Sequence, residues 1–251
     1  MERNLKLTLA YDGHDFAGWQ VQPGRDTVQG MLVSAIEHLT GEKTLPQGSG
    51  RTDAGVHALA QVASVRIRSP IPLSNLRKAL NDTLPQSIRI LNVEEAAPDF
   101  HARKSARAKT YRYRIYRDEI CPPFLARYVY HHPYPLEEER MIQSADEVLG
   151  EHDFTSFAAV DPERNRENIE MPNIRTIYTS HWQREGTELV YTVRGNGFLH
   201  HMVRNLVGTF LMIGKGSLNR HDLKRILEAR NRSAASATAP ASGLFLVSVE
   251  Y

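Results

Sequence analysis

The spacing of apolar residues alternates along this chain between the two-residue period of a strand and the helical period of about 3.6 residues. Leu5, Leu7 and Leu9 alternate with polar or small neighbours, which is the pattern of a strand with one buried face. Residues 109–117 alternate in the same way. Within 28–39, by contrast, apolar residues recur as on one face of an amphipathic helix. A chain that mixes both periods over its length is expected to fold as an α+β protein.

The same patterns predict the remaining elements. Asp26 and Gln29 form a capping-box pattern before the 28–39 helix, and Gly41 is its expected C-cap. A turn near Glu185-Gly186 is expected to form a hairpin. We expect two α/β halves, residues 1–100 and 101–251. The other predicted strands are 61–67, 88–93, 176–182, 189–194 and 244–251, the other predicted helices are 74–84, 136–149, 198–213 and 221–229, and 232–242 is a predicted loop.

Composition excludes several classes of protein. Apolar residues make up 41% of the 251 residues and charged residues 24%, which is ordinary globular usage and excludes disorder as the main state. The single cysteine, Cys121, excludes a disulfide framework and a zinc site built on cysteines. The start of the chain lacks the apolar run of a signal peptide, and polar residues interrupt the most apolar window, Phe198–Ile213. We therefore expect a soluble cytoplasmic protein.

Charge is distributed unevenly although its sum is small. The chain has 31 Lys and Arg against 29 Asp and Glu, a formal net charge of +2. Within 43–81 the only acid is Asp53, and no acid lies within 100–117 or 189–221. Acids gather instead within 137–170. Such segregation is typical of a protein with one basic face that meets nucleic acid, the alternative being chance clustering on solvated faces.

The most informative segment is Gly48–His57, which surrounds Arg51-Thr52-Asp53 with glycines. It lacks the Gly-Lys-Ser/Thr ending of a phosphate-binding P-loop. Because Arg51 lies beside it in the sequence, the charged form of Asp53 is favoured, which suits a nucleophile or an electrostatic stabiliser better than a general acid. The alternative is a structural turn aspartate that caps the turn and pairs with Arg51.

Two further segments carry candidate residues. Tyr111 lies among arginines in a predicted strand, a mixture typical of surfaces that stack on RNA bases. The alternative is that Tyr111 faces the core, as Tyr113 is expected to do. On the predicted 198–213 helix, His200 and His201 lack the i, i+4 spacing of a helical metal pair, so no metal site is expected. Arg204 on the same apolar helix needs a partner, because a buried unpaired charge is costly.

Several motifs together closely resemble a known family, the tRNA pseudouridine synthases of the TruA type. They are GRTDAGVHA, KTYRYRIYR, HDFTSF and HHMVRN, and they occur in the order found in that family. The resemblance extends from KLTLAYDGHDFAGWQ near the start to GLFLVSVEY at the end, which makes a chance match to one short motif an inadequate explanation.

The resemblance implies an α+β pseudouridine synthase fold of two related halves. Mainly antiparallel sheets flanked by helices would enclose an active-site cleft between the halves. The half formed by 1–100 would carry the aspartate loop, and the half formed by 101–251 would carry the tyrosine and the HHMVRN helix. It implies isomerisation of uridine to pseudouridine at about positions 38 to 40 of the tRNA anticodon stem-loop, where the base must leave the stack to be reached. It also implies a homodimer and a reaction without a cofactor.

The resemblance also assigns roles to residues. The catalytic aspartate falls on Asp53, the active-site tyrosine on Tyr111, and the active-site arginines on Arg51 and Arg204. Asp53 would attack the sugar, attack the base or stabilise charge at C1′, and the sequence leaves these three branches open. Tyr111 would stack on the flipped base and could assist loss of the C5 proton, while the arginines keep Asp53 ionised.

The tRNA backbone would be met by arginines of the basic stretches, namely Arg25, Arg66, Arg103, Arg112 and Arg114. Two other functions stay open. One is a non-catalytic tRNA-binding protein on the same scaffold, which an Asp53→Asn variant distinguishes from the isomerase because binding would survive and product formation would not. The other is an RNA phosphodiesterase that uses His200 and His201, which would leave cleaved tRNA.

Overall fold

The computed structural model describes residues 2–160 and 172–251, so the end of the acid-rich stretch, 161–170, lies outside the described residues. The chain divides into two compact units, residues 1–107 with 245–251 and residues 108–244. This division differs from the expected halves in assigning the C-terminal strand to the first unit. The reason is that Phe245 pairs in parallel with His57, so the end of the chain joins the first unit's sheet.

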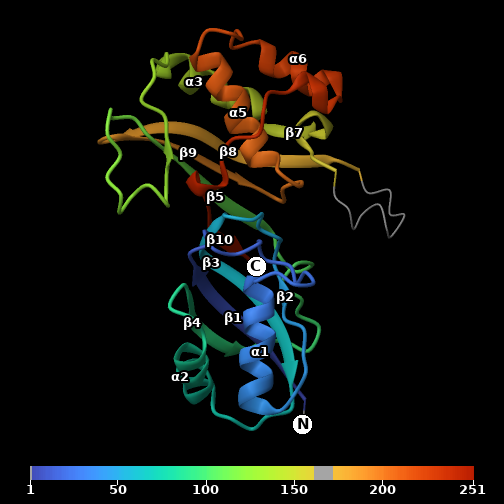
Figure 1. Cartoon of the computed structure of the whole chain (residues 1–251). Coiled ribbons are helices and arrows are strands. Elements are labelled where there is room, and N and C mark those ends of the chain that lie inside the picture. Colours follow the sequence, from blue (N-terminus) through green and yellow to red (C-terminus); the bar gives the residue numbers. More distant parts are fainter. Residues whose placement is uncertain (1, 161–171) are drawn as a thin grey trace. The chain divides into compact units, whose positions relative to one another are not determined.

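The first unit is built on a mainly antiparallel sheet (Figure 1). The strand order is β4-β1-β3-β10, and the short β2 also pairs with β3. β1 pairs antiparallel with both neighbours, whereas β10 runs parallel to β3. The bounds of these strands are β1 (Arg3–Tyr11), β2 (Gln47–Gly48), β3 (His57–Ile67), β4 (Ile88–Glu95) and β10 (Leu244–Glu250).

Two helices, α1 (Val28–Thr40) and α2 (Leu73–Thr83), complete the first unit. The alternation predicted for β1 is confirmed, since Leu5 and Leu7 are fully buried. Ile36 of α1 and Leu80 of α2 line the same small cavity as these two leucines. Both helices therefore cover the apolar face of the sheet.

The predicted N-cap of α1 is wrong by one residue. The cap is Thr27, whose hydroxyl accepts a hydrogen bond from the backbone N–H of Gly30. Gln29 cannot complete a capping box, because its buried side-chain amide donates to the carbonyl of Pro46 and accepts from the N–H of Val21. The predicted C-cap is confirmed, with Gly41 in the left-handed conformation at φ 72°.

The second unit contains mainly antiparallel strands in the order β5-β9-β8-β7, with the short β6 parallel to β5. The predicted hairpin near Glu185-Gly186 is confirmed, because Gly186 at φ 58° turns the chain between β8 and β9. The bounds are β5 (Ala108–Tyr116), β6 (Tyr130–His131), β7 (Gly150–Asp153), β8 (Ile174–Glu185) and β9 (Glu188–Gly195).

Helices cover one face of the strands of the second unit (Figure 1). Phe210 of α5 is fully buried, with its ring centroid 5.1 Å from that of Tyr191 in β9 and 5.7 Å from that of Trp182 in β8. No helix among residues 2–160 and 172–251 is both long and apolar enough to cross a membrane. The helices are α3 (Glu138–Ser144), α5 (Met202–Gly214) and α6 (Asp222–Ala229), with 3₁₀ turns at Ala145–Val148, Thr155–Phe157, Arg232–Ala234 and Ala241–Gly243.

Two predicted helices of this unit differ from those observed. The 136–149 helix is shorter than expected because it tightens after α3 into a 3₁₀ turn, where the N–H of Leu149 bonds to the carbonyl of Asp146. The 198–213 helix begins only at Met202. The preceding residue, His201, has φ 60°, which lies in the left-handed region and cannot continue a right-handed helix.

Candidate active site

Asp53 lies in a tight turn between β2 and β3. The N–H of Val56 donates a hydrogen bond to the carbonyl of Asp53, which closes the turn at 3.1 Å. Gly55, the third residue of the turn, has φ 78°, a conformation that glycine adopts without strain. Asp53 is half-buried, with a buried threonine before it and an exposed alanine after it.

A buried polar network supports the residue before Asp53. The hydroxyl of Thr52 lies 2.8 Å from that of Tyr11 at the end of β1. Gln61 of β3 donates to the Tyr11 hydroxyl at 3.3 Å and to the carbonyl of Gly50 at 3.0 Å, and its side-chain oxygen accepts from the hydroxyl of Ser49 at 2.6 Å. Burial raises the pKa of Tyr11 to about 12, while the hydrogen bonds of Thr52 and Gln61 oppose the rise. The Tyr11 hydroxyl therefore stays neutral in this network.

The loop before α1 packs against the other side of the same turn. The N–H of Trp19 donates to the carbonyl of Thr52 at 3.0 Å, and the N–H of Gly55 donates to the carbonyl of Phe16 at 3.3 Å. Gly18 has φ 94°, and a Cβ atom there would lie 2.6 Å from the Thr52 carbonyl oxygen. The two loops thus approach each other at a distance that only glycine permits.

Arg51 shares the loop with Asp53 but is exposed. Its Nε donates to the side-chain oxygen of Gln20 at 3.1 Å, in the same loop before α1. The first unit therefore brings Arg51 and Asp53 together in one segment that is braced from two sides.

Tyr111 lies in β5 of the second unit, paired with Val193 of β9. It is 8% exposed, and its ring meets that of Phe198 edge-on with centroids 5.0 Å apart. The prediction that Tyr113 faces the core is confirmed, since its side chain is fully buried. Its hydroxyl donates to the carbonyl of Pro240 at 2.8 Å.

Arg204 lies in the first turn of α5, one residue before the buried Asn205. Its Nε donates to the carbonyl of Ala239 at 2.8 Å, and its own carbonyl accepts from the N–H of Ala239. Burial raises the pKa of the nearby Tyr113 above its usual range, and the positive charge of Arg204 opposes that rise. The second unit therefore connects Tyr113, two residues from Tyr111, to Arg204 through Pro240 and Ala239.

His200 and His201 precede α5 rather than lying on it, so the prediction that both are helical is wrong. Their ring centroids are 4.0 Å apart. Nδ1 of His200 lies 2.9 Å from the carbonyl oxygen of Val160, and the His200 carbonyl accepts from the N–H of Ala159. His200 thus takes part in the packing of the 159–160 segment beside α5.

Three of the predicted backbone-binding arginines, Arg25, Arg66 and Arg103, are exposed in the first unit. Arg66 donates to the carbonyl of Pro98 at 2.8 Å and lies 3.5 Å from the carboxylate of Glu2. These side chains project from the loop before α1, from the end of β3 and from the segment that follows β4.

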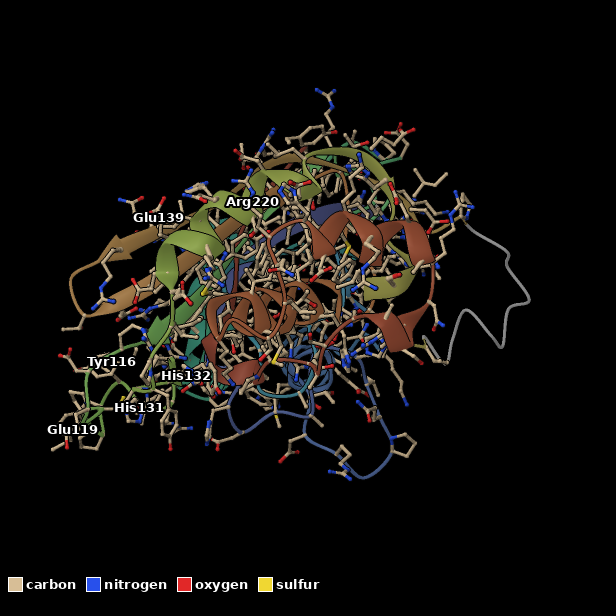
Figure 2. The ribbon with its side chains drawn as sticks, turned by 90° about the horizontal axis from the view of Figure 1, so that it is seen from above. Tyr116, Glu119, His131, His132, Glu139 and Arg220 are labelled. Atoms are coloured by element: carbon tan, nitrogen blue, oxygen red, sulfur yellow. The ribbon has the colours of Figure 1, made fainter. Side chains whose placement is uncertain are left out.

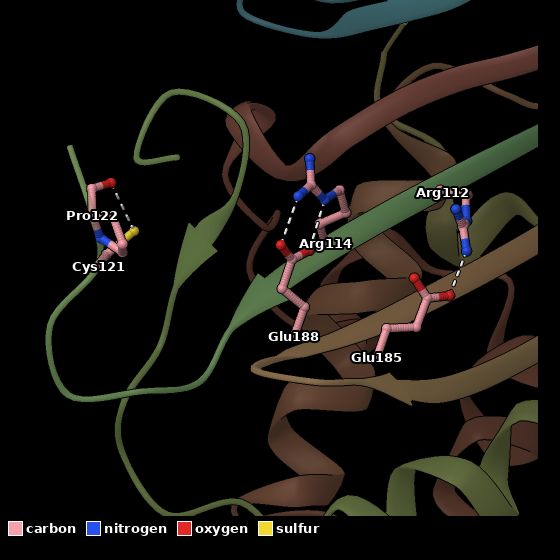
Figure 3. Close-up of polar contacts among 6 residues, drawn as sticks. All are labelled: Arg112, Arg114, Cys121, Pro122, Glu185 and Glu188. Carbon is pink, nitrogen blue, oxygen red and sulfur yellow. Dashed lines mark hydrogen bonds and ion pairs between the residues drawn. The ribbon is translucent and has the colours of Figure 1, made fainter. Parts of the chain in front are cut away.

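The other two, Arg112 and Arg114 of β5, are paired with acids (Figure 3). Arg112 lies 2.5 Å from Glu185, and Arg114 makes two hydrogen bonds of 2.7 and 2.6 Å to Glu188. The sequence shows an acid-free stretch around these arginines, but the β8–β9 hairpin brings glutamates across the sheet. Part of their positive charge is therefore neutralised.

A group of residues that contact Arg204 could not be recognised from the sequence. They lie in 236–240, a stretch of small and polar residues predicted only as loop. The contacts to Arg204 and Tyr113 use the main-chain carbonyls of Ala239 and Pro240. Since every residue has a carbonyl, no side-chain signal marks these positions.

Comparisons with known proteins agree with one another. A model of the family described as "tRNA pseudouridine synthase" matches residues 8–103 and 145–251. A protein named tRNA pseudouridine synthase A from Solibacter usitatus (strain Ellin6076) is 54% identical, covering 99% of this chain and 100% of the relative. Proteins of the same name from Lacticaseibacillus casei (strain BL23) and Caldicellulosiruptor bescii are 44% and 42% identical, covering 99% of this chain and 99% and 100% of those relatives.

Proposed function

The chain belongs to the tRNA pseudouridine synthase family, and from that membership we propose which of its residues carry out the reaction. It is an isomerase that converts uridine in tRNA to pseudouridine. The reaction breaks the N1–C1′ bond, turns the uracil and forms a C5–C1′ bond, while one proton leaves C5 and one is gained at N1. Atoms and electrons balance within the nucleoside, so the overall reaction requires no oxidant or reductant.

Asp53 is the proposed nucleophile or charge stabiliser. The observation that carries this assignment is the support of its turn, which the Tyr11–Thr52 hydrogen bond braces from one side and the Trp19 N–H from the other. A carboxylate held in a fixed position reacts with little loss of conformational entropy. Asp53 is also the only acid between residues 43 and 81, so it would meet an anionic RNA among positive charges.

Tyr111, Arg51 and Arg204 are the proposed partners of Asp53 in the reaction. Tyr111 would stack on the uracil after it leaves the helix and assist loss of the C5 proton. The two guanidinium groups would stabilise negative charge that develops on the base. These roles rest on the match to the family and on the physical chemistry of the side chains.

The proposed target is the anticodon stem-loop, at about positions 38 to 40, where a base must be flipped out of the stack. Arg25, Arg66 and Arg103, which are exposed, are the stronger candidates for phosphate contacts, and the acid-paired Arg112 and Arg114 the weaker ones. We further propose that the enzyme works as a homodimer in the cytoplasm.

The reaction and its site are tested together with an unmodified tRNA transcript that has uridine at positions 38, 39 and 40. Pseudouridine is mapped by carbodiimide modification and primer extension before and after incubation. The proposal expects new stops at these positions and none in transcripts that carry cytidine there. Pseudouridine confined to another arm of the tRNA would contradict the proposed target, and fragments of cleaved tRNA would contradict isomerisation.

A further inference from the structure

Residues 236–240, called here the 236–240 segment, lie antiparallel along α5. The contacts follow one another in order along both partners. The N–H of Ser236 donates to the hydroxyl of Thr209 at 3.3 Å, and Ala237 lies against Gly208, where a Cβ atom would be 1.9 Å from the Ala237 carbonyl oxygen. The absence of a side chain at Gly208 is therefore what lets the segment rest on the helix.

Two consecutive residues of α5 hold two consecutive residues of the segment. Arg204 contacts Ala239 twice, through its Nε at 2.8 Å and through its carbonyl at 3.1 Å. Asn205 accepts a hydrogen bond of 2.7 Å from the hydroxyl of Thr238. Because Thr238 and Ala239 are adjacent, fixing the first also fixes the carbonyl to which Arg204 donates.

Asn205 is fully buried and makes further hydrogen bonds that fix its orientation. Its side-chain nitrogen donates to the carbonyl of Phe157 at 2.7 Å. Its oxygen also accepts from Arg232 at 3.1 Å, and Arg232 in turn donates to Thr238 at 3.3 Å and to the carbonyl of Ala235 at 3.2 Å. Both the nitrogen and the oxygen of the Asn205 amide are therefore hydrogen-bonded, and the oxygen faces the 236–240 segment.

The segment ends on the strand that carries Tyr111. The hydroxyl of Tyr113 donates to the carbonyl of Pro240 at 2.8 Å, next to the Ala239 carbonyl that binds Arg204. Tyr113 is fully buried, and its pKa is raised by burial, so it remains a neutral donor. Both ends of the Ala239-Pro240 dipeptide are therefore anchored, one on α5 and one on β5.

We propose that Asn205 and Thr238 are positioning residues, which act through the 236–240 segment to aim the guanidinium of Arg204 for the isomerisation. This inference rests on the proposed role of Arg204. A guanidinium is planar, so a hydrogen bond at Nε restricts where its two terminal nitrogens point. A long side chain without that bond would sample several rotamers, and small misplacements of a catalytic group slow a reaction strongly.

The test compares Thr238→Val with Thr238→Ser. Valine keeps the volume of threonine but loses the hydroxyl that bonds to Asn205, whereas serine keeps the hydroxyl. With the full-length protein and an unmodified tRNA transcript, we expect Thr238→Val to lower kcat about tenfold, with KM and tRNA affinity changed less than about twofold. Thr238→Ser is expected to retain nearly the wild-type kcat. Thermal unfolding of both variants shows whether each is folded at the assay temperature.

A second background separates positioning from a general loss of structure. If Thr238 acts through Arg204, then Thr238→Val adds no further loss of kcat to the Arg204→Ala variant. Equal losses in both backgrounds, or an unchanged kcat for Thr238→Val alone, would overturn the inference and leave the proposed role of Arg204 intact. An unchanged kcat for Arg204→Ala would instead overturn that role, and the inference with it.

Discussion

The hydroxyl oxygens of Tyr11 and Thr52 lie 2.8 Å apart, which ties the residue before Asp53 to the end of β1. Tyr11 is 4% exposed and Thr52 is 6% exposed, so water competes little for this hydrogen bond. The backbone that carries the proposed catalytic carboxylate is thereby fixed to the sheet of the first unit. We therefore expect both the stability of the fold and the rate of the reaction to depend on the Tyr11–Thr52 hydrogen bond.

Replacing Tyr11 by Phe should affect both quantities. The change leaves Thr52 and Gln61 without their shared partner, and we expect the free energy of unfolding to fall by about 1–3 kcal/mol. We also expect kcat to fall, because the turn that carries Asp53 loses its support. Urea unfolding and steady-state kinetics on a tRNA transcript measure the two effects.

The matched control is Tyr191→Phe, since the Tyr191 hydroxyl also lies 2.8 Å from a buried hydroxyl, that of Ser180 in the second unit. It should lose a similar amount of stability with little change in kcat. Equal kcat losses in the two variants would mean that the Tyr11 contact has no particular connection with Asp53.

A substitution at Gly18 tests the close approach of the two loops. Gly18→Ala adds a Cβ atom 2.6 Å from the Thr52 carbonyl oxygen at a residue with φ 94°. Gly24→Ala is the control, because Gly24 also has a positive φ, 67°, but nothing lies within 4 Å of the added atom. We expect about 1 kcal/mol of backbone strain in both variants, and a further loss of stability and of kcat only in Gly18→Ala. Indistinguishable variants would argue against a tight loop contact.

His132 should make stability fall in mild acid. The His132 side chain is 2% exposed and is labelled in Figure 2 together with Tyr116 and His131. Its pKa is lowered from 6.5 to about 4, mainly by burial and further by the positive charges of Lys215 and Arg117. As pH falls below 6.5 the unfolded chain binds a proton at this side chain, while the folded chain does not until about pH 4. Stability is therefore fully present above about pH 7 and declines toward pH 4, by up to about 3 kcal/mol.

The measurement is the free energy of unfolding at about pH 7 and about pH 4.5, for the wild type and for His132→Phe. Carboxylates titrate in both proteins. The difference between the two proteins in the stability lost from the higher to the lower pH therefore isolates the contribution of the imidazole. The variant should lose less stability than the wild type on acidification. Parallel curves would contradict a depressed pKa at His132.

The arginines should differ in their contribution to tRNA affinity. Arg103 is exposed, whereas Arg112 lies 2.5 Å from Glu185. The logarithm of affinity falls linearly with the logarithm of salt concentration, and removing a side chain that neutralises a phosphate makes this fall less steep by about one unit of slope. We expect Arg103→Ala to show that change and Arg112→Ala a smaller one, measured by filter binding over a range of salt concentrations. The reverse order would place the RNA against β5.

Local patterns predicted much of the fold. The alternation of Leu5, Leu7 and Leu9 identified β1, and Gly41 and Gly186 marked a helix end and a hairpin, because each of these signals depends on neighbouring residues alone. The N-cap of α1 could not be predicted in the same way. The side chain of Gln29 bonds to the distant Pro46 carbonyl, and Thr27 is the N-cap in place of Asp26.

The candidate site was predictable only in part. Asp53 stands out in the sequence because no other acid lies within 43–81. The pairing of Arg114 with Glu188 could not be read from the chain, since strand register brings together residues that are 74 positions apart. The support of Arg204 was equally hidden, because it comes from the main-chain carbonyl of Ala239.

The most direct test of the central claim is the rate of pseudouridine formation by Asp53→Asn on a saturating, unmodified tRNA transcript. Asparagine keeps the size of the side chain but removes its negative charge and its nucleophilic oxygen. The account predicts that product formation falls by at least about a thousandfold while tRNA affinity and thermal unfolding stay close to those of the wild type. Pseudouridine formed by the variant at the wild-type rate would contradict the assignment of Asp53 as the residue that carries out the reaction.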